Sequence, residues 1–112
     1  MLASIHEYTV FMYNTQVIVS FGDKATRDIY DGRDTKAARK IPRDLWPRIQ
    51  DKLDLMNAAV SLNDLKVPPS NRLEKLRGDL ESFHSIRVNL QYRLIFRFAG
   101  QHCADVRCRD YH

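Results

Sequence analysis

The spacing of hydrophobic residues changes once along the chain, and the change predicts a helical half followed by a sheet half. From Asp44 to Val60 apolar residues recur every three or four positions, which predicts a helix with one buried stripe. Pro47 is compatible with this helix because the N–H groups of a first helical turn have no partner within the helix. The stripe consists of Leu45, Ile49, Leu53, Met56 and Val60.

Two shorter elements are predicted before this helix. Gln16 to Phe21 is rich in β-branched residues and stops at Gly22, which is typical of a strand. Asp23 is a suitable N-cap for a short helix from Lys24 to Tyr30, and the Asp31-Gly32 pair ends that helix.

Beyond the extended connection at residues 68–71 the period becomes two, which predicts antiparallel strands joined by short turns. Tyr92 to Phe98 alternates most clearly, with Leu94 and Phe96 on one face and Arg93 on the other. The whole pattern predicts an α+β fold, with an N-terminal strand and two helices packed on one face of a three- to four-stranded, mainly antiparallel sheet. The sheet strands are expected between Leu73 and Gly78, from Ser82 to Val88, from Tyr92 to Phe98 and from Cys103 to Asp110.

The 112 residues are enough for one domain, and 44% hydrophobic with 29% charged residues is an ordinary globular composition. We expect the domain to span residues 17–112. Residues 1–16 are an extension of uncertain status, either an extra strand or helix or a segment that precedes a true start at Met12. No apolar run approaches the roughly 20 residues that span a bilayer, so no membrane partner is expected.

The net charge and the cysteine and histidine residues indicate which kinds of partner and chemistry to expect. Eighteen Lys and Arg against fourteen Asp and Glu give a net charge of +4, which favours an acidic partner such as nucleic acid. Cys103 and Cys108 are interpreted as free thiols of a cytoplasmic protein, and a Cys–His nucleophile has no support in the spacing. The four histidines lack metal-ligand spacing, so neither a metal nor a cofactor is expected.

Polar residues of the sheet half are the candidates for chemistry. Arg87 and Arg93 are expected to face each other across the Asn89-Leu90 turn, where two guanidinium groups could hold a phosphate. Glu74 and His112 beside such a cradle would form an acid–base pair. The alternative is a solvent-facing sheet surface with ordinary ion pairs.

Three segments and the C-terminus resemble the signature of HigB-type toxins in the RelE/ParE superfamily. The resemblance covers Val17 to His112, nearly the whole chain. The segments are residues 62–79, residues 84–89, residues 92–96 and the terminal Asp110-Tyr111-His112. The chain departs from the family pattern at Ser70, Leu90 and Tyr92, where Gly, an acidic residue and Trp are usual.

This resemblance implies the toxin of a type II toxin–antitoxin pair, acting as an endoribonuclease that cuts messages on the ribosome. The implied partner is a HigA-like antitoxin with a helix-turn-helix domain, and the toxin would reach operator DNA only through that complex. A ParE-like toxin that poisons gyrase and a non-catalytic nucleic-acid-binding module are the alternatives. The Arg, Glu and His set favours RNA cleavage.

The resemblance also suggests roles for individual residues in metal-free cleavage by the ribose 2′-hydroxyl. Glu74 is the expected base, His112 the acid, and Arg93 with Arg87 the cations on the non-bridging oxygens. Further expected roles are a flanking phosphate for Arg77, orientation of His112 for Asp110, and base stacking for Tyr111. The basic run from Arg33 to Arg43 is either a solvated loop or a surface that docks on ribosomal RNA through Arg33, Lys36, Arg39 and Lys40.

Overall fold

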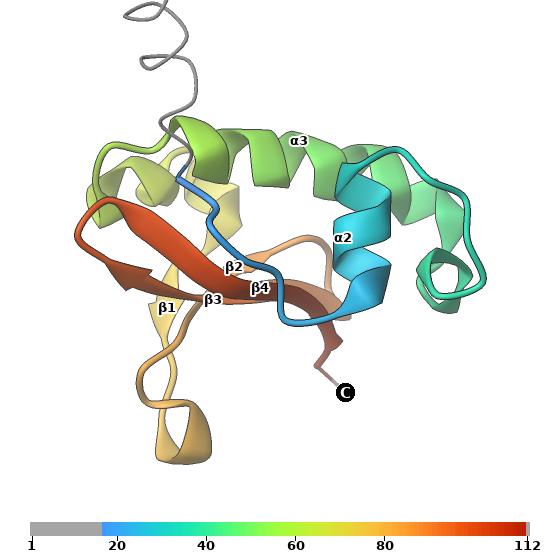
Figure 1. Ribbon diagram of the computed structural model, residues 1–112. Coiled ribbons are helices and arrows are strands. Elements are labelled where there is room, and N and C mark those ends of the chain that lie inside the picture. Colours follow the sequence, from blue (N-terminus) through green and yellow to red (C-terminus); the bar gives the residue numbers. More distant parts are fainter. Residues whose placement is uncertain (1–16, 112) are drawn as a thin grey trace, which may run out of the picture.

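The computed structural model describes residues 17–111; the predictions for residues 1–16 and for His112 lie outside this range. Two helices lie on one side of a four-stranded sheet, which confirms the α+β class (Figure 1). The helices are α2 (Lys24–Tyr30) and α3 (Trp46–Ala58), and the strands are β1 (Glu74–Lys75), β2 (His84–Arg87), β3 (Tyr92–Ala99) and β4 (His102–Asp110). Short 3₁₀ helices occupy Ala38–Lys40, Arg43–Leu45, Leu62–Lys66, Pro69–Asn71 and Gly78–Leu80.

The short helix α2 has the predicted bounds and the predicted cap. A side-chain oxygen of Asp23 accepts a 2.8 Å hydrogen bond from the backbone N–H of Thr26, so one of the orphan donors at the helix start is satisfied.

The long helix α3 begins at Trp46, with Pro47 in its first turn as expected. Its apolar stripe is buried at Ile49, Leu53 and Met56, but the prediction for Val60 is wrong, since this side chain is 65% exposed. The helix ends at Ala58. The backbone at Ala59 is extended, so the side chain of Ala59, and not that of Val60, is buried in the core.

The sheet has the order β1-β2-β3-β4, and all neighbouring strands are antiparallel. The N-terminal segment lies along the outer edge of β4 in the parallel sense, where Ile18 pairs with Cys103 and Phe21 with Val106. These are two isolated bridges rather than the continuous strand predicted for residues 16–21. Asp105, with a φ of 54°, interrupts the regular backbone of β4 between the two bridges.

The core lies between the helices and the sheet, and it takes Leu94 and Phe96 from β3 as the alternation predicts. Side chains at the centre of the opposite face of β3 are also shielded from solvent, because Arg93 is only 6% exposed and Ile95 is fully buried. Figure 1 shows β1 and the connection to β2 projecting from the sheet away from the helices. Arg93 is therefore a buried cation on the helix-free face of the sheet.

Candidate functional site

Neutral oxygen atoms hold the buried guanidinium of Arg93. Its Nε donates to Oγ of Ser85 at 2.8 Å, and one Nη donates to the carbonyl oxygen of Arg72 at 2.6 Å. The same Nη lies 3.5 Å from the carbonyl oxygen of Ser85. No carboxylate of residues 17–111 forms an ion pair with Arg93. The position of this charge is thus fixed while the charge itself is not neutralised by the described part of the chain.

The carbonyl of Arg72 faces Arg93 because of the local backbone. Arg72 follows the 3₁₀ turn Pro69–Asn71 in the left-handed conformation, with a φ of 46°. Asn71 is fully buried, and its amide donates to the carbonyl oxygens of Leu65 and Val67, both at 3.2 Å. Lys52 of α3 in turn donates to the side-chain oxygen of Asn71. This network ties the segment before β1 to α3 and fixes the acceptor for Arg93.

Strand register brings further cations to the same row of the sheet. Arg93 is paired with Arg87 of β2 on one side and with Arg109 of β4 on the other. Directly paired residues of antiparallel strands point to the same face. The predicted pairing of Arg87 with Arg93 is therefore confirmed, and Arg109 extends the row to a third strand.

The groups around Arg93 shift the pKa of its guanidinium in opposite directions. Burial lowers the pKa of the Arg93 guanidinium, Arg87 and Arg72 lower it further, and Glu74 and Tyr111 act in the opposite direction. The group stays protonated, since an arginine does not lose its proton in a protein. Tyr111 lies with its ring centroid 5.7 Å from Cζ of Arg93, which is a cation–π distance.

Four of the predicted residues are thus brought together: Glu74, Arg87, Arg93 and Tyr111. Asp110 ends β4 close by, where it is paired with Tyr92 and accepts a 2.9 Å hydrogen bond from the side chain of Gln91. Arg77 is exposed at the start of the turn between β1 and β2, and no hydrogen bond or ion pair between described residues joins its side chain to Arg93 or Glu74.

Sequence reasoning missed Ser85 and Arg72, the two residues that hold Arg93. Ser85 carries a weak signal, since it is a lone hydroxyl in a strand that otherwise supplies the core at Ile86. Arg72 carries no signal, because it acts through its carbonyl oxygen and nothing in the sequence marks an arginine for a positive φ.

The basic segment between α2 and α3 is exposed at Arg33, Lys36, Arg39 and Lys40. Arg39 forms an ion pair with Asp34 at 2.9 Å, and Arg43 forms another with the second oxygen of the same carboxylate. Lys36 and Lys40 make no ion pair with a described residue. The segment is therefore partly compensated from within and still carries excess positive charge.

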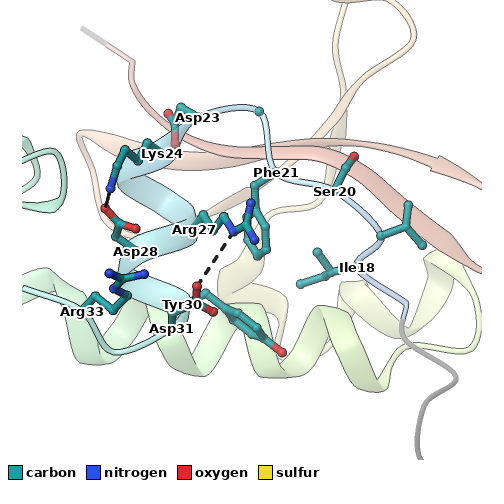
Figure 2. Close-up of a pocket in the computed structure, with 12 residues that line it drawn as sticks. Ile18, Ser20, Phe21, Asp23, Lys24, Arg27, Asp28, Tyr30, Asp31 and Arg33 are labelled. Carbon is teal, nitrogen blue, oxygen red and sulfur yellow. Dashed lines mark hydrogen bonds and ion pairs between the residues drawn. The ribbon is translucent and has the colours of Figure 1, made fainter. Parts of the chain in front are cut away.

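A different concavity, of about 900 Å³, lies between residues 18–22 and α2 (Figure 2). Its lining has as many aspartates as cations: Asp23, Asp28 and Asp31 against Lys24, Arg27 and Arg33. Lys24 lies 2.6 Å from Asp28, and Arg27 lies 3.9 Å from Asp31. The hydrogen bond from Lys24 is the main reason that the pKa of Asp28 is lowered. This concavity therefore lacks the unneutralised charge found at Arg93.

The described residues give little support to other chemistries. Cys103 and Cys108 are both buried free thiols, and burial raises the pKa of each to about 12, so neither is a thiolate near neutral pH. Among residues 17–111 no group of three His, Cys, Asp or Glu side chains could hold a metal ion. The described helices include none with the length and apolar character to cross a membrane.

Comparison with known proteins agrees with this fold and identifies the family. A chain of the YoeB–YefM complex from Staphylococcus aureus has the same fold, with a TM-score of 0.54 at 18% identity over 85% of this chain and 97% of that one. Residues 19–112 match the family described as RelE-like toxin of type II toxin-antitoxin system HigB. The chain thus has a RelE-like toxin fold. It belongs to the HigB-like family and is a toxin of a type II toxin–antitoxin system.

Two curated relatives show the range of similarity within this family. The protein is 42% identical over 80 residues to Toxin HigB-1 of Vibrio cholerae, covering 71% of this chain and 82% of the relative. It is 27% identical over 96 residues to Endoribonuclease HigB of Proteus vulgaris, and the match covers 86% of this chain and 100% of the relative.

Proposed function

We propose that this toxin is an endoribonuclease that cleaves mRNA on the ribosome, with Arg93 stabilising the charge on the reacting phosphate. The observation that carries the proposal is a buried guanidinium whose donors, among the described residues, meet only neutral oxygens. A buried charge is costly unless an opposite charge compensates it, and a phosphodiester supplies that charge when bound. The name of the Proteus vulgaris relative supports the same activity.

The proposed reaction is attack of a ribose 2′-oxygen on the adjacent phosphorus. Glu74 takes the proton of the 2′-hydroxyl as the O2′–P bond forms, and the P–O5′ bond breaks as His112 gives a proton to the 5′-oxygen. The products are a 2′,3′-cyclic phosphate and a 5′-hydroxyl. Glu74 is exposed on β1 and is paired with Ser85, so it lies beside the residue that holds Arg93.

The cations have distinct tasks in this proposal. Arg93 and Arg87 hold the non-bridging oxygens, whose negative charge grows in the transition state. Arg77 contacts a flanking phosphate from its exposed position after β1. Tyr111 stacks on a base, and Asp110 orients His112.

The proposed partners follow from this activity. Arg33, Lys36, Arg39 and Lys40 contact ribosomal RNA in the cytoplasm, where exposed cations give salt-dependent affinity with little sequence preference. A HigA-like antitoxin with a helix-turn-helix domain neutralises the toxin, and operator DNA is reached only through that complex. Residues 17–112 form the domain that carries all of these contacts.

The test is induced expression of the wild type, Arg93→Gln and Arg27→Gln, followed by primer extension on a reporter message. Arg27 is the matched control because its side chain is 70% exposed on α2, away from the Arg93 row. We expect growth arrest and new 5′-hydroxyl ends, both dependent on ribosomes, from the wild type and the control. Arg93→Gln should lose both effects while still binding the antitoxin, which shows that it is folded. Growth arrest with intact messages would contradict cleavage and indicate a gyrase-directed toxin.

A further inference from the structure

A groove of about 580 Å³ lies between α3 and the turn that joins β2 to β3. Two cations come from α3, one from the left-handed residue before β1, and one from the end of β2. The charged residues that line the groove are Arg48, Asp51, Lys52, Arg72 and Arg87. Leu90, which is 83% exposed, adds an apolar surface.

The cations of this groove are not neutralised by the described chain. Arg48 donates to the carbonyl oxygen of Val88 at 3.3 Å, and Lys52 donates to the amide oxygen of Asn71. None of the four cations forms an ion pair with a residue in the range 17–111. Burial lowers the pKa of Lys52, the nearby charge of Arg48 lowers it further, and Asp51 acts in the opposite direction. Four cations against one carboxylate make the groove attractive to an anion.

The groove continues toward the proposed catalytic residues. Ser70 and Arg72 also line a neighbouring groove of about 570 Å³, and Glu74 forms part of its wall. At the other end, Arg87 is paired with Arg93 across the sheet. One extended ligand with regularly spaced negative charges can therefore contact this groove and the proposed catalytic residues at once.

We propose that this groove binds a phosphate of single-stranded RNA outside the cleavage position, so that the strand runs from Arg48 past Arg72 to Glu74. The direction of the strand rests on the proposed function, whereas binding of RNA in the groove does not. A guanidinium presents a planar fork of donors that fits phosphate oxygens, and the groove has three of them. The apolar face of Leu90 provides a contact for a ribose or a base. An acidic segment of a protein partner is the competing occupant.

The test uses an oligoribonucleotide with 2′-O-methyl groups throughout, which cannot be cleaved by 2′-oxygen attack. Its affinity for the wild type, Arg48→Gln, the double variant Arg48→Gln/Arg72→Gln and Arg27→Gln is measured by fluorescence anisotropy over a range of salt concentrations. We expect Arg48→Gln to bind about threefold to tenfold more weakly and Arg27→Gln to bind like the wild type. The slope of log affinity against log salt should fall by about 0.7 for each phosphate that the variant no longer neutralises.

Length dependence locates the contact. A dinucleotide probe that fills only the cleavage position should bind the wild type and Arg48→Gln equally, and only a probe of several more nucleotides should distinguish them. Arg48→Gln with the affinity and salt slope of Arg27→Gln would overturn the inference. So would a wild type that does not bind the probe, or an Arg48→Gln protein that binds RNA normally but has a weakened affinity for the antitoxin.

The outcomes for the groove and for catalysis are separable. Weaker RNA binding by Arg48→Gln supports the groove even if the wild type cuts no message. Message cleavage by the wild type, together with unchanged RNA binding by Arg48→Gln, overturns the groove and leaves the proposed function standing.

Discussion

The carbonyl oxygen of Arg72 accepts a 2.6 Å hydrogen bond from the guanidinium of Arg93, which lies two strands further along the sheet. This bond joins the segment before β1 to the centre of β3 on the helix-free face. It does not neutralise the positive charge of Arg93, because a carbonyl accepts a hydrogen bond without carrying a full negative charge, and no carboxylate of residues 17–111 forms an ion pair with this guanidinium. The site is therefore rigid and still attractive to an anion.

Ser85→Ala removes the acceptor for Nε of Arg93. A buried donor without a partner costs about 1–3 kcal/mol, so the free energy of unfolding in urea should fall by that amount. Message cleavage should fall with it, because the guanidinium is then held by only one of its two short hydrogen bonds. Ser82→Ala, at an exposed position before β2, is the control and should change neither quantity. Full cleavage by Ser85→Ala would mean that Arg93 needs no such support.

Asn71→Ala should be more damaging than its position before β1 suggests. The amide is fully buried and bonds two carbonyl oxygens, while Lys52 donates to it from α3. Its removal takes one bond each from the carbonyl oxygens of Leu65 and Val67 and from the ammonium of Lys52, and we expect the free energy of unfolding to fall by about 2–4 kcal/mol in a urea titration. Ser70→Ala, next to it and exposed, should cost little. A similar small decrease for both variants would show that the Asn71 network does not hold this segment.

His84 should make the protein less stable as the pH falls below about 6.5. Burial lowers the pKa of its imidazole, Lys75 lowers it further, and no described group bonds its buried Nδ1. Between the lowered folded value and the unfolded value of about 6.5, the unfolded chain binds more protons, so stability rises with pH.

Urea titrations at several pH values test this dependence. His84→Gln should have a flatter profile than the wild type over that window. His102→Gln, which changes an exposed imidazole on β4, should keep the wild-type slope. Equal slopes for the wild type and His84→Gln would assign the pH dependence to other groups.

The two cysteines should react with a thiol reagent only when the protein unfolds. Both thiols are buried and have a pKa of about 12, so the native state offers neither access nor thiolate at pH 8. Labelling with iodoacetamide across a urea series should follow the unfolding curve. Rapid labelling of Cys103 or Cys108 in the native protein would contradict their placement in the core.

Local sequence patterns determined the elements of this fold. The Asp23 cap and the Asp31-Gly32 stop gave α2 its bounds, and the period of two gave β3 and β4 theirs to within one residue. The short Asn89-Leu90 turn also determined that Arg87 and Arg93 pair, because a hairpin fixes its own register. Such features depend on residues that are close together in the chain.

Arg93 was a candidate from the sequence, but tertiary structure alone decided that its guanidinium is buried and held by neutral oxygens. Its burial depends on Ser85 and Arg72, and the position of Arg72 depends on Asn71 and on Lys52 of a distant helix. The groove cations likewise come from three separate elements. Hydrophobic period and turn residues carry no information about which carbonyl will face which guanidinium, since that depends on how the finished layers pack. The sequence by itself therefore determined the elements and one arginine pair, and packing decided which charge is buried without an ion-pair partner among residues 17–111.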